Sequence, residues 1–363
     1  MGSCVGLPAD LRGVRPVLPF HGCILGALAN TYPARYAVQI IGFAEGFVSE
    51  QRRRRLSLVR ASTRAFWREG RRTAGYSLLD FLHGYVYGRW PYLYIGVGTR
   101  QRELPRALRP IVDAISRVLL RRSRGDSKDT KRRFADTYHG KVVPTGAAVR
   151  LVTVHKEIDL RNLERIIPYA TARDIVLREP DHIVALECPC RSVREDPCLP
   201  LDVCLIVGEP FAGFVAEHHP MRSRRVTQDE AVEILRAEHE RGHVHHAFFK
   251  DAMLGRFYAI CNCCRCCCGA MQAWRHGTPM LASSGYVCEP DAERCVGCGA
   301  CAEVCPFDAL TMTDGVVAVD EARCMGCGVC VSKCAQNALA LRREPSKGEP
   351  LEIPELMSAA VKG

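Results

Sequence analysis

A cysteine pattern that occurs twice near the carboxyl end constrains the fold of this chain more than any other feature. RCVGCGACAEVCPFDAL (residues 294–310) aligns without a gap with RCMGCGVCVSKCAQNAL (residues 323–339), and nine of the seventeen positions are identical. Each copy spaces its cysteines as C-x-x-C-x-x-C-x-x-x-C. Three cysteines at this spacing can bind three corners of a cubane [4Fe–4S] cluster, and the fourth can reach a second cluster. Zinc sites instead pair two C-x-x-C knuckles at a distance, so the repeat predicts two iron–sulfur clusters.

The repeat resembles the two-cluster bacterial-type ferredoxins over residues 285–343. The family usually has proline after the last cysteine of each copy, as at Pro306, whereas Ala335 stands there in the second copy. TMTDGVVAVD between the copies predicts the hairpin that this fold requires, with its turn at Asp314-Gly315. The resemblance implies that one cluster binds to Cys295, Cys298, Cys301 and Cys334. It implies that the other binds to Cys324, Cys327, Cys330 and Cys305.

Ten further cysteines form two blocks in the middle of the chain, and neither block has the ferredoxin spacing. The first block holds Cys188, Cys190, Cys198 and Cys204. The second block holds Cys261, Cys263, Cys264, Cys266, Cys267 and Cys268. A turn can bring both thiols of a C-x-C pair to one metal, and thiolate is a soft ligand that selects zinc, copper(I) or iron–sulfur clusters. We therefore expect a third iron–sulfur centre built from both blocks, with a Cys4 zinc site as the alternative.

CPCR followed by CNCCRCCC and then by the cysteine repeat is similar to the arrangement in a group of bacterial 4Fe–4S-binding proteins of about this length. The ten cysteines exceed the four ligands of one cubane cluster, so some thiols are available for other chemistry. A C-P-C motif beside a cluster resembles ferredoxin–thioredoxin reductase, and vicinal cysteines resemble the heterodisulfide reductases. The full spacing of neither family is present. These likenesses imply an alternative function, a cluster-assisted thiol or disulfide oxidoreductase at the middle cysteines.

The composition is that of an ordinary globular protein, and a cytoplasmic location is expected. Hydrophobic residues make up 47% of the 363 residues and charged residues 25%, which are ordinary values for a folded domain. The sequence has neither an eighteen-residue apolar run nor an apolar amino-terminal segment of the secretory type. In a reducing compartment, 21 cysteines are expected to serve as metal ligands or redox groups and not as disulfides.

Charge is distributed unevenly along the chain. Residues 1–150 carry 27 Lys and Arg against 10 Asp and Glu, whereas the remaining residues carry 23 against 30. The basic half is expected to attract an acidic subunit or an anionic membrane surface. No nucleic-acid-binding motif accompanies it, so no nucleic acid is expected. Because no dinucleotide or haem fingerprint occurs either, a redox partner protein is the expected electron donor or acceptor.

The sequence predicts an α+β chain of four parts: a basic helical region (1–125), a cysteine-rich α+β unit (140–285), a two-cluster ferredoxin domain (286–345) and a tail (346–363). Helices are expected over 33–70 and 104–120, after Ser77 with Asp80 as its capping partner, and from Thr227 to Gly242. Residues 121–133 are expected to form a loop. Strands are expected over 149–156 and 181–189.

Two other segments contain candidate functional side chains. In RGHVHHAFF, His243 and His245 would share one face of a strand and could form a ligand pair or a proton relay, although hydrogen-bonded structural histidines are more common. The aromatic residues of 76–96 suit either core packing or a docking surface. Together the patterns favour an electron-transfer function. Whether a substrate is also transformed stays open, and an enzyme of this kind would be an oxidoreductase.

Overall fold

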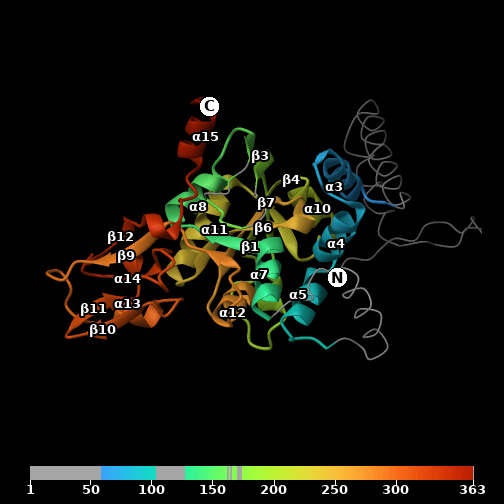
Figure 1. Cartoon of the computed structure of the whole chain (residues 1–363). Coiled ribbons are helices and arrows are strands. Elements are labelled where there is room, and N and C mark those ends of the chain that lie inside the picture. Colours follow the sequence, from blue (N-terminus) through green and yellow to red (C-terminus); the bar gives the residue numbers. More distant parts are fainter. Residues whose placement is uncertain (1–58, 104–126, 162, 164–165, 170–173, 363) are drawn as a thin grey trace, which may run out of the picture. The chain divides into compact units, whose positions relative to one another are not determined.

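The computed structural model describes residues 59–103, 127–161, 163, 166–169 and 174–362 (Figure 1). The chain divides into two units, Met1–Arg60 and Ala61–Gly363, and the fold given below is that of the second unit. It is a mixed α+β structure, as predicted. Of the helix expected over 33–70, residues 61–70 are helical and residues 33–58 lie outside the described residues, as does the helix expected over 104–120. Among the described helices, none is long and apolar enough to cross a membrane.

Three helices follow one another at the start of this unit: α3 (Ala61–Arg72), α4 (Leu78–Arg89) and α5 (Pro91–Gly98). The predicted capping box of α4 is confirmed, because the Asp80 amide donates to Ser77 Oγ at 3.2 Å and the Ser77 amide donates to Asp80 Oδ2 at 2.9 Å. In α3, Phe66 is fully buried against Phe211 and Phe214 in edge-on ring contacts. Helix α3 therefore packs into the core through Phe66, whereas α4 and α5 leave several large apolar side chains exposed, among them Leu79 and Leu93.

An eight-stranded sheet forms the centre of the unit. Its strand order is β2-β3-β4-β7-β6-β1-β8, and β5 pairs with β3. All pairs are antiparallel except β1 with β8. The strands are β1 (Tyr138–Val142), β2 (Ile158–Leu160), β3 (Ile175–Leu186), β4 (Cys204–Glu209), β5 (Ser223–Val226), β6 (Val244–Lys250), β7 (Arg256–Cys263) and β8 (Leu281–Ala282).

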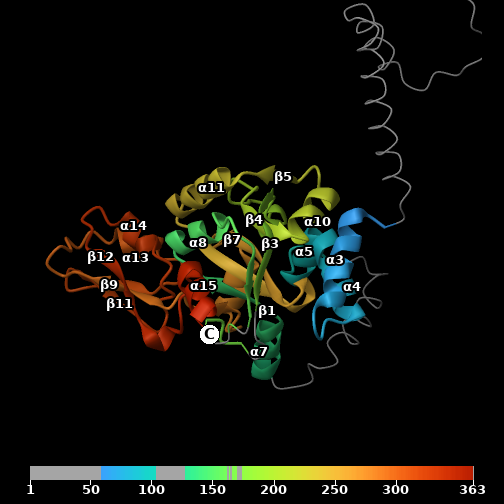
Figure 2. The same ribbon diagram turned by 90° about the horizontal axis from the view of Figure 1, so that it is seen from above.

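Helices pack on both faces of this sheet (Figure 2). One face is covered by α8 (Thr145–Val152) and α11 (Gln228–Glu240), with α15 (Ile353–Lys362) beside α8. The other face carries α10 (Phe211–His218) and the three amino-terminal helices. The shorter elements are α7 (Ser127–Thr137), α9 (Pro189–Ser192), η1 (Asp251–Met253), α12 (Gly269–Arg275) and η2 (Pro345–Lys347). The middle cysteines line the second face, because Cys204 and Cys263 are buried in its core.

The carboxyl-terminal unit has an approximate internal repeat that follows the repeat in its sequence. Each cysteine-rich loop leads into a five-residue helix, α13 (Ala300–Val304) or α14 (Val329–Lys333). Strands β10 (Leu310–Thr313) and β11 (Val316–Val319) form the predicted hairpin, and β9 (Tyr286–Pro290) pairs with β12 (Leu339–Arg343). The turn is confirmed at Asp314 and Gly315, whose φ angles are +52° and +78°, as type I′ turns require.

Two local predictions are wrong. Residues 149–156 were expected to form a strand, but residues up to Val152 belong to helix α8. Ala147, Ala148, Leu151 and Val152 are buried, and this helical spacing decides the structure over the β-branched composition. The loop expected over 121–133 is helical from Ser127 onward, in α7, where Ala135 is fully buried. The strand over 181–186 and the helix from Thr227 to a left-handed Gly242 are confirmed.

Candidate metal centres

The sequence repeat brings the first predicted ligand set together at one hollow, here called the outer site. Its cysteines are Cys295, Cys298, Cys301 and Cys334. Gly297 and Gly299 take left-handed φ angles of +69° and +76°, which lets the loop wrap closely around a shared centre. A side chain at Gly297 would bring its Cβ to 2.5 Å from the Gly315 carbonyl oxygen. Cys298 is exposed, so this hollow lies at the surface.

The second predicted ligand set lines a hollow here called the inner site: Cys324, Cys327, Cys330 and Cys305. Cys324, Cys330 and Cys305 are buried. The two sites share a hydrogen-bond pattern, because the Ala309 amide donates to Cys305 Sγ and the Ala338 amide donates to Cys334 Sγ, both at 3.3 Å. Such N–H···S bonds stabilise thiolates that bind clusters.

A fifth cysteine at the inner site, Cys288 on β9, was missed in the sequence. Its amide donates to Cys324 Sγ at 3.3 Å, and its own sulfur lies 3.6 Å from Cys330 Sγ. Hydrogen bonding to Cys330 and burial raise the pKa of the Cys288 thiol. The two copies of the cysteine pattern are offset by 29 residues, and this offset makes Cys288 equivalent to Val317, which lines the outer site. Extending the alignment of the copies toward the amino terminus could therefore have pointed to Cys288.

The sheet brings the two middle cysteine blocks together. In the β4–β7 pair, Cys204 of the first block stands directly opposite Cys261 of the second. The buried guanidinium of Arg191, which follows CPC, donates to the carbonyl oxygens of Pro200 and Asn262 at 2.5 and 3.0 Å. It also pairs with the buried carboxylate of Glu238. This network ties the loop of the first block to the strand that carries the second.

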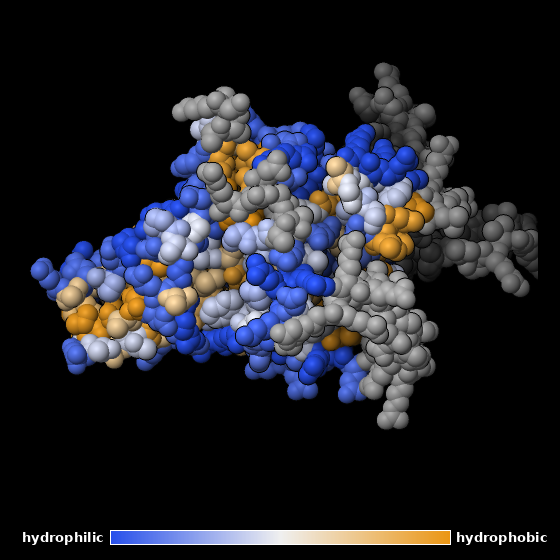
Figure 3. Space-filling view, viewed as in Figure 1, coloured by the Kyte–Doolittle hydropathy of each residue, from blue (hydrophilic) through white to orange (hydrophobic). Residues whose placement is uncertain are grey.

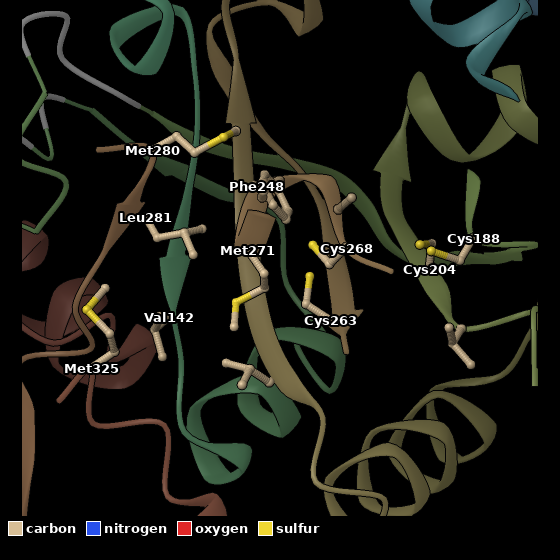
Figure 4. Close-up of a cluster of buried hydrophobic side chains, with 14 of the residues drawn as sticks. Val142, Cys188, Cys204, Phe248, Cys263, Cys268, Met271, Met280, Leu281 and Met325 are labelled. Carbon is tan, nitrogen blue, oxygen red and sulfur yellow. The ribbon is translucent and has the colours of Figure 1, made fainter. Parts of the chain in front are cut away.

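Six of the ten middle thiols gather in one buried pocket, here called the six-thiol pocket. Figure 4 shows the sulfur of Cys188 beside that of Cys204, and the sulfur of Cys263 beside that of Cys268. These six cysteines are Cys188, Cys190, Cys204, Cys261, Cys263 and Cys268, and a seventh, Cys264, also reaches the lining of the pocket. Hydrogen bonding with the Cys190 thiol and burial raise the pKa of Cys188 to about 12. So many thiols can ionise together in a buried pocket only beside a compensating cation, which is what a metal centre supplies.

The other four middle thiols form a separate group, here called the four-thiol cluster: Cys198, Cys264, Cys266 and Cys267. The four sulfur atoms all lie within 4.8 Å of one another. Cys266 is exposed and Cys264 and Cys267 are buried. The structure therefore brings both predicted blocks together but places their cysteines in two adjoining groups, which meet at Cys264.

Tyrosine side chains and one lysine stand beside the six-thiol pocket. Tyr87 and Tyr138 line the pocket, and Tyr87 and Tyr258 share a hydrogen bond between their hydroxyls at 2.9 Å. The buried ammonium of Lys250 lies over the rings of Tyr87 and Tyr138 at 4.9 and 4.5 Å. Burial lowers the pKa of Lys250 to about 8 and raises the pKa of Tyr138. Groups able to give or accept a proton thus border the sulfur-lined pocket.

The histidines near the second block take different positions. His243 is bonded to Glu238 at 2.7 Å, whereas His245 is bonded to the side-chain oxygen of Asn262 at 2.6 Å. Burial lowers the pKa of His245 to about 4 and that of His246 to about 3, so both rings are neutral at pH 7. His246 stands opposite Cys261 in the β6–β7 pair. Among the described residues, neither of its ring nitrogens has a hydrogen-bond partner, which marks this position as one with room for a further polar interaction.

The cysteine-rich loop after β7 contacts the inner site directly. Arg265, between two cysteines of the four-thiol cluster, donates to the carbonyl oxygen of Cys305 at 3.4 Å and pairs with Asp308 at 2.6 Å. Arg275 of α12 also pairs with Asp308, at 3.3 Å. The rings of Trp274 and Phe307 meet edge-on with 5.2 Å between their centroids. The segment that follows Cys305 is therefore packed against the middle unit.

One protein-family model matches part of the chain, and the match agrees with this geometry. Residues 289–311 match the 4Fe-4S binding domain. The matched segment holds Cys295, Cys298, Cys301 and Cys305. The chain thus contains a ferredoxin-like iron–sulfur domain near its carboxyl end, with residues suited to hold at least one [4Fe–4S] cluster. Among curated proteins, no sequence matches the chain.

Proposed function

We propose that this protein transfers single electrons between a redox partner protein and a third metal centre in its own middle unit. Two [4Fe–4S] clusters, held at the outer and inner sites, would supply the one-electron chemistry, since such clusters take up and release electrons at potentials set by their surroundings. The six-thiol pocket would hold the third, iron–sulfur centre. The ligand sets are those expected from the sequence, and their geometry supports them.

The contact between Arg265 and Cys305 is the observation that carries this proposal. Cys305 belongs to the inner ligand set, and Arg265 belongs to the loop whose neighbouring cysteines line the middle sites. Asp308 holds two arginines of the middle unit at the same place. An electron relay needs its centres held close in a fixed arrangement, and these contacts hold the inner site against the cysteine-rich loop.

The outer site offers a surface for the partner. Cys298 is exposed, and Val296 beside it is 66% exposed. Met312 of β10 is also exposed. Figure 3 shows hydrophobic colour over the face formed by the carboxyl-terminal unit. Apolar side chains around an exposed redox site suit a transient protein contact of small area. The acidic subunit or anionic membrane surface expected at the basic amino-terminal half remains a prediction, since most of that half lies outside the described residues.

Iron and acid-labile sulfide, measured per chain after anaerobic purification, test the proposal together with EPR of the reduced protein. About twelve irons with three interacting cluster signals are expected. About eight irons would mean that the middle unit holds no cubane cluster, and the relay would then end at the inner site. About four irons would contradict the two-cluster assignment itself.

A second candidate function is a thiol or disulfide oxidoreductase that uses the middle cysteines. One observation favours it: the sulfurs of Cys198 and Cys266 lie 3.0 Å apart, and Cys266 is exposed. A mild oxidant would then form one specific disulfide, which electrons arriving through the ferredoxin-like domain would reduce. Mass mapping of the oxidised protein tests this function, and the finding that all the middle thiols stay metal-bound or reduced would reject it.

A further inference from the structure

The spacing of the four-thiol cluster differs from what a cubane needs. Its four sulfurs lie within 4.8 Å of one another, with Cys198 and Cys266 at 3.0 Å and Cys266 and Cys267 at 3.6 Å. A single metal ion bonded to four sulfurs at about 2.3 Å keeps every sulfur pair about 3.8 Å apart. The thiolates of a cubane cluster bind four separate irons at its corners and stand around a larger body. The observed spacing suits one ion.

We propose that the four-thiol cluster is a separate mononuclear centre, in which one Zn²⁺ or Fe²⁺ ion binds Cys198, Cys264, Cys266 and Cys267 tetrahedrally. Binding breaks four S–H bonds, forms four metal–sulfur bonds and releases four protons to solvent, and no electron moves. The proposal rests on the proposed function in one respect: the six-thiol pocket is then the part of the middle unit that holds the iron–sulfur centre.

The loop after β7 already has the backbone of a metal knuckle. Cys264 and Cys267 are related by the C-x-x-C spacing of zinc sites. The Cys267 amide donates to Cys264 Sγ at 3.4 Å, the kind of N–H···S bond that stabilises a bound thiolate. The side-chain amide of Gln272 donates to the carbonyl oxygens of Arg265 and Cys266 at 2.9 and 3.2 Å. These bonds hold three of the four ligands in position within one short loop.

The charge around the cluster suits a tetrathiolate centre. A divalent ion with four thiolates carries a net charge of about −2. Arg194 donates to the carbonyl oxygen of Cys267 at 3.2 Å, and Arg265 lies between Cys264 and Cys266 in the loop itself. The Arg194 guanidinium beside the centre offsets part of its charge, which makes binding four thiolates in a partly buried place less costly. The guanidinium of Arg265 pairs with Asp308 instead.

This centre lies where it could serve one of two roles, and the metal ion that binds decides which. Cys264 also lines the six-thiol pocket, and Arg265 contacts the carbonyl oxygen of Cys305 at the inner site. An iron ion bound here would add a one-electron centre between these two sites. A zinc ion would be redox-inert and would fasten the loop of Cys198 to the loop after β7.

The test uses the full-length chain, purified anaerobically, with metals and acid-labile sulfide measured per chain. A Cys198→Ser/Cys266→Ser variant is expected to lose one metal ion and to keep all of its sulfide. The matched control, Cys188→Ser/Cys204→Ser, removes two thiols of the six-thiol pocket and is expected to lose iron and sulfide together while keeping the single ion. X-ray absorption at the zinc edge then identifies a zinc ion by its four sulfur neighbours at about 2.3 Å. An iron ion is identified by the loss of one iron from the Cys198→Ser/Cys266→Ser variant.

Loss of sulfide from the Cys198→Ser/Cys266→Ser variant would overturn the proposal, because its cysteines would then belong to a cluster. Unchanged metal content, or a Cys198–Cys266 disulfide in the anaerobic protein, would also overturn it. If the control keeps all of its sulfide, the proposed third iron–sulfur centre fails while the mononuclear centre stands. Since Cys266 is exposed, a single Cys266→Ser change keeps the test usable where the double variant does not fold, with far-UV circular dichroism and the EPR of the ferredoxin-like domain as fold controls.

Discussion

Cys288 differs from every other cysteine of the carboxyl-terminal unit because the repeat supplies a complete ligand set without it. Its amide donates to Cys324 Sγ and its sulfur contacts Cys330 Sγ. At the equivalent position, the outer site has the side chain of Val317. The two sites thus differ in the polarity of one neighbouring side chain, and hydrogen bonds to cluster ligands tune reduction potential.

Replacing Cys288 with alanine should leave iron and sulfide content unchanged and should shift the reduction potential and EPR signal of the inner cluster only. The backbone amide still donates to Cys324, but the contact of the thiol with Cys330 is lost. A redox titration followed by EPR measures the shift. Cys324→Ala is the control and should lose the inner cluster. Loss of about four irons from the Cys288 variant would instead make Cys288 a ligand.

Arg191 and Glu238 form a buried ion pair in the middle unit. Both side chains are only 1% exposed. Burial opposes the charge of Glu238, but hydrogen bonding from His243 and the charge of Arg191 outweigh it, so the pKa of Glu238 is lowered. Its carboxylate therefore stabilises the fold above its unfolded pKa of about 4.3, and this contribution is lost as pH falls through the lower folded pKa.

Glu238→Gln should destabilise the protein by roughly 3–5 kcal/mol near pH 7, because it leaves the Arg191 guanidinium buried without a counter-ion. Urea unfolding followed by circular dichroism, with the metals retained, measures the change. The gap between variant and wild type should narrow as pH falls below about 4. Glu240→Gln, at an exposed neighbour, is the control and should leave the unfolding midpoint in place. An equal effect of both changes would contradict this account.

At the scale of elements, the packing of α4 against η1 depends on a close backbone approach. An ideal Cβ at Gly84 would lie 2.0 Å from the carbonyl oxygen of Ala252, which is backbone and cannot move aside easily. Tyr76, just before α4, donates to the same carbonyl oxygen at 2.8 Å. The helix therefore sits where only glycine leaves room.

Gly84→Ala should destabilise the unit by about 1–3 kcal/mol through overpacking, in spite of the better helix propensity of alanine. Thermal unfolding compares it with Gly98→Ala at the end of α5, where a Cβ meets nothing within 4 Å among the described residues. The control should be neutral or slightly stabilised. If Gly84→Ala left the thermal stability unchanged, α4 would be able to shift away from η1.

The sequence predicted helix ends, turns and strands correctly where these depend on interactions between residues close together in the chain. The caps at Ser77 and Thr227, the turn at Asp314-Gly315 and the strand over 181–186 depend on neighbours a few residues away. Residues 149–152 were assigned to a strand from their β-branched composition, but helical burial decides their structure. The pairing of β4 with β7 joins residues more than fifty positions apart. Because no local signal encodes that pairing, the placing of the ten middle cysteines in two adjoining groups could not be predicted.

At the scale of the whole described unit, Asp308 helps to join the two cysteine-bearing parts through Arg265 and Arg275 of the middle unit. It pairs with Arg265, Arg275 and Arg323. Its side chain is 38% exposed, so each pair alone contributes little to stability. Asp308 holds Arg265 beside Cys305. We therefore expect a change of Asp308 to affect the proposed electron exchange between the two parts more than their folding.

Asp308→Asn should slow electron exchange between the inner cluster and the middle centre while iron and sulfide contents stay as in the wild type. Rapid-mixing reduction through the outer site, followed by freeze-quench EPR of each centre, measures the rate. Glu321→Gln, which breaks an ion pair with Arg342, is the matched control and should leave the rate unchanged. Equal rates in all three proteins would mean that electrons do not cross at the Arg265–Cys305 contact.

Under the proposed function, the contact between Arg265 and Cys305 also sets the kinetic order expected of electron exchange. Because both partners belong to one polypeptide and are already docked, their encounter requires no diffusion. Exchange across this contact should therefore be first-order, with a half-time that does not change on dilution. Only reduction by the external partner should slow as the protein is diluted. In a cell that makes few copies of this chain, the supply of reduced partner would then limit turnover, and the internal step would not.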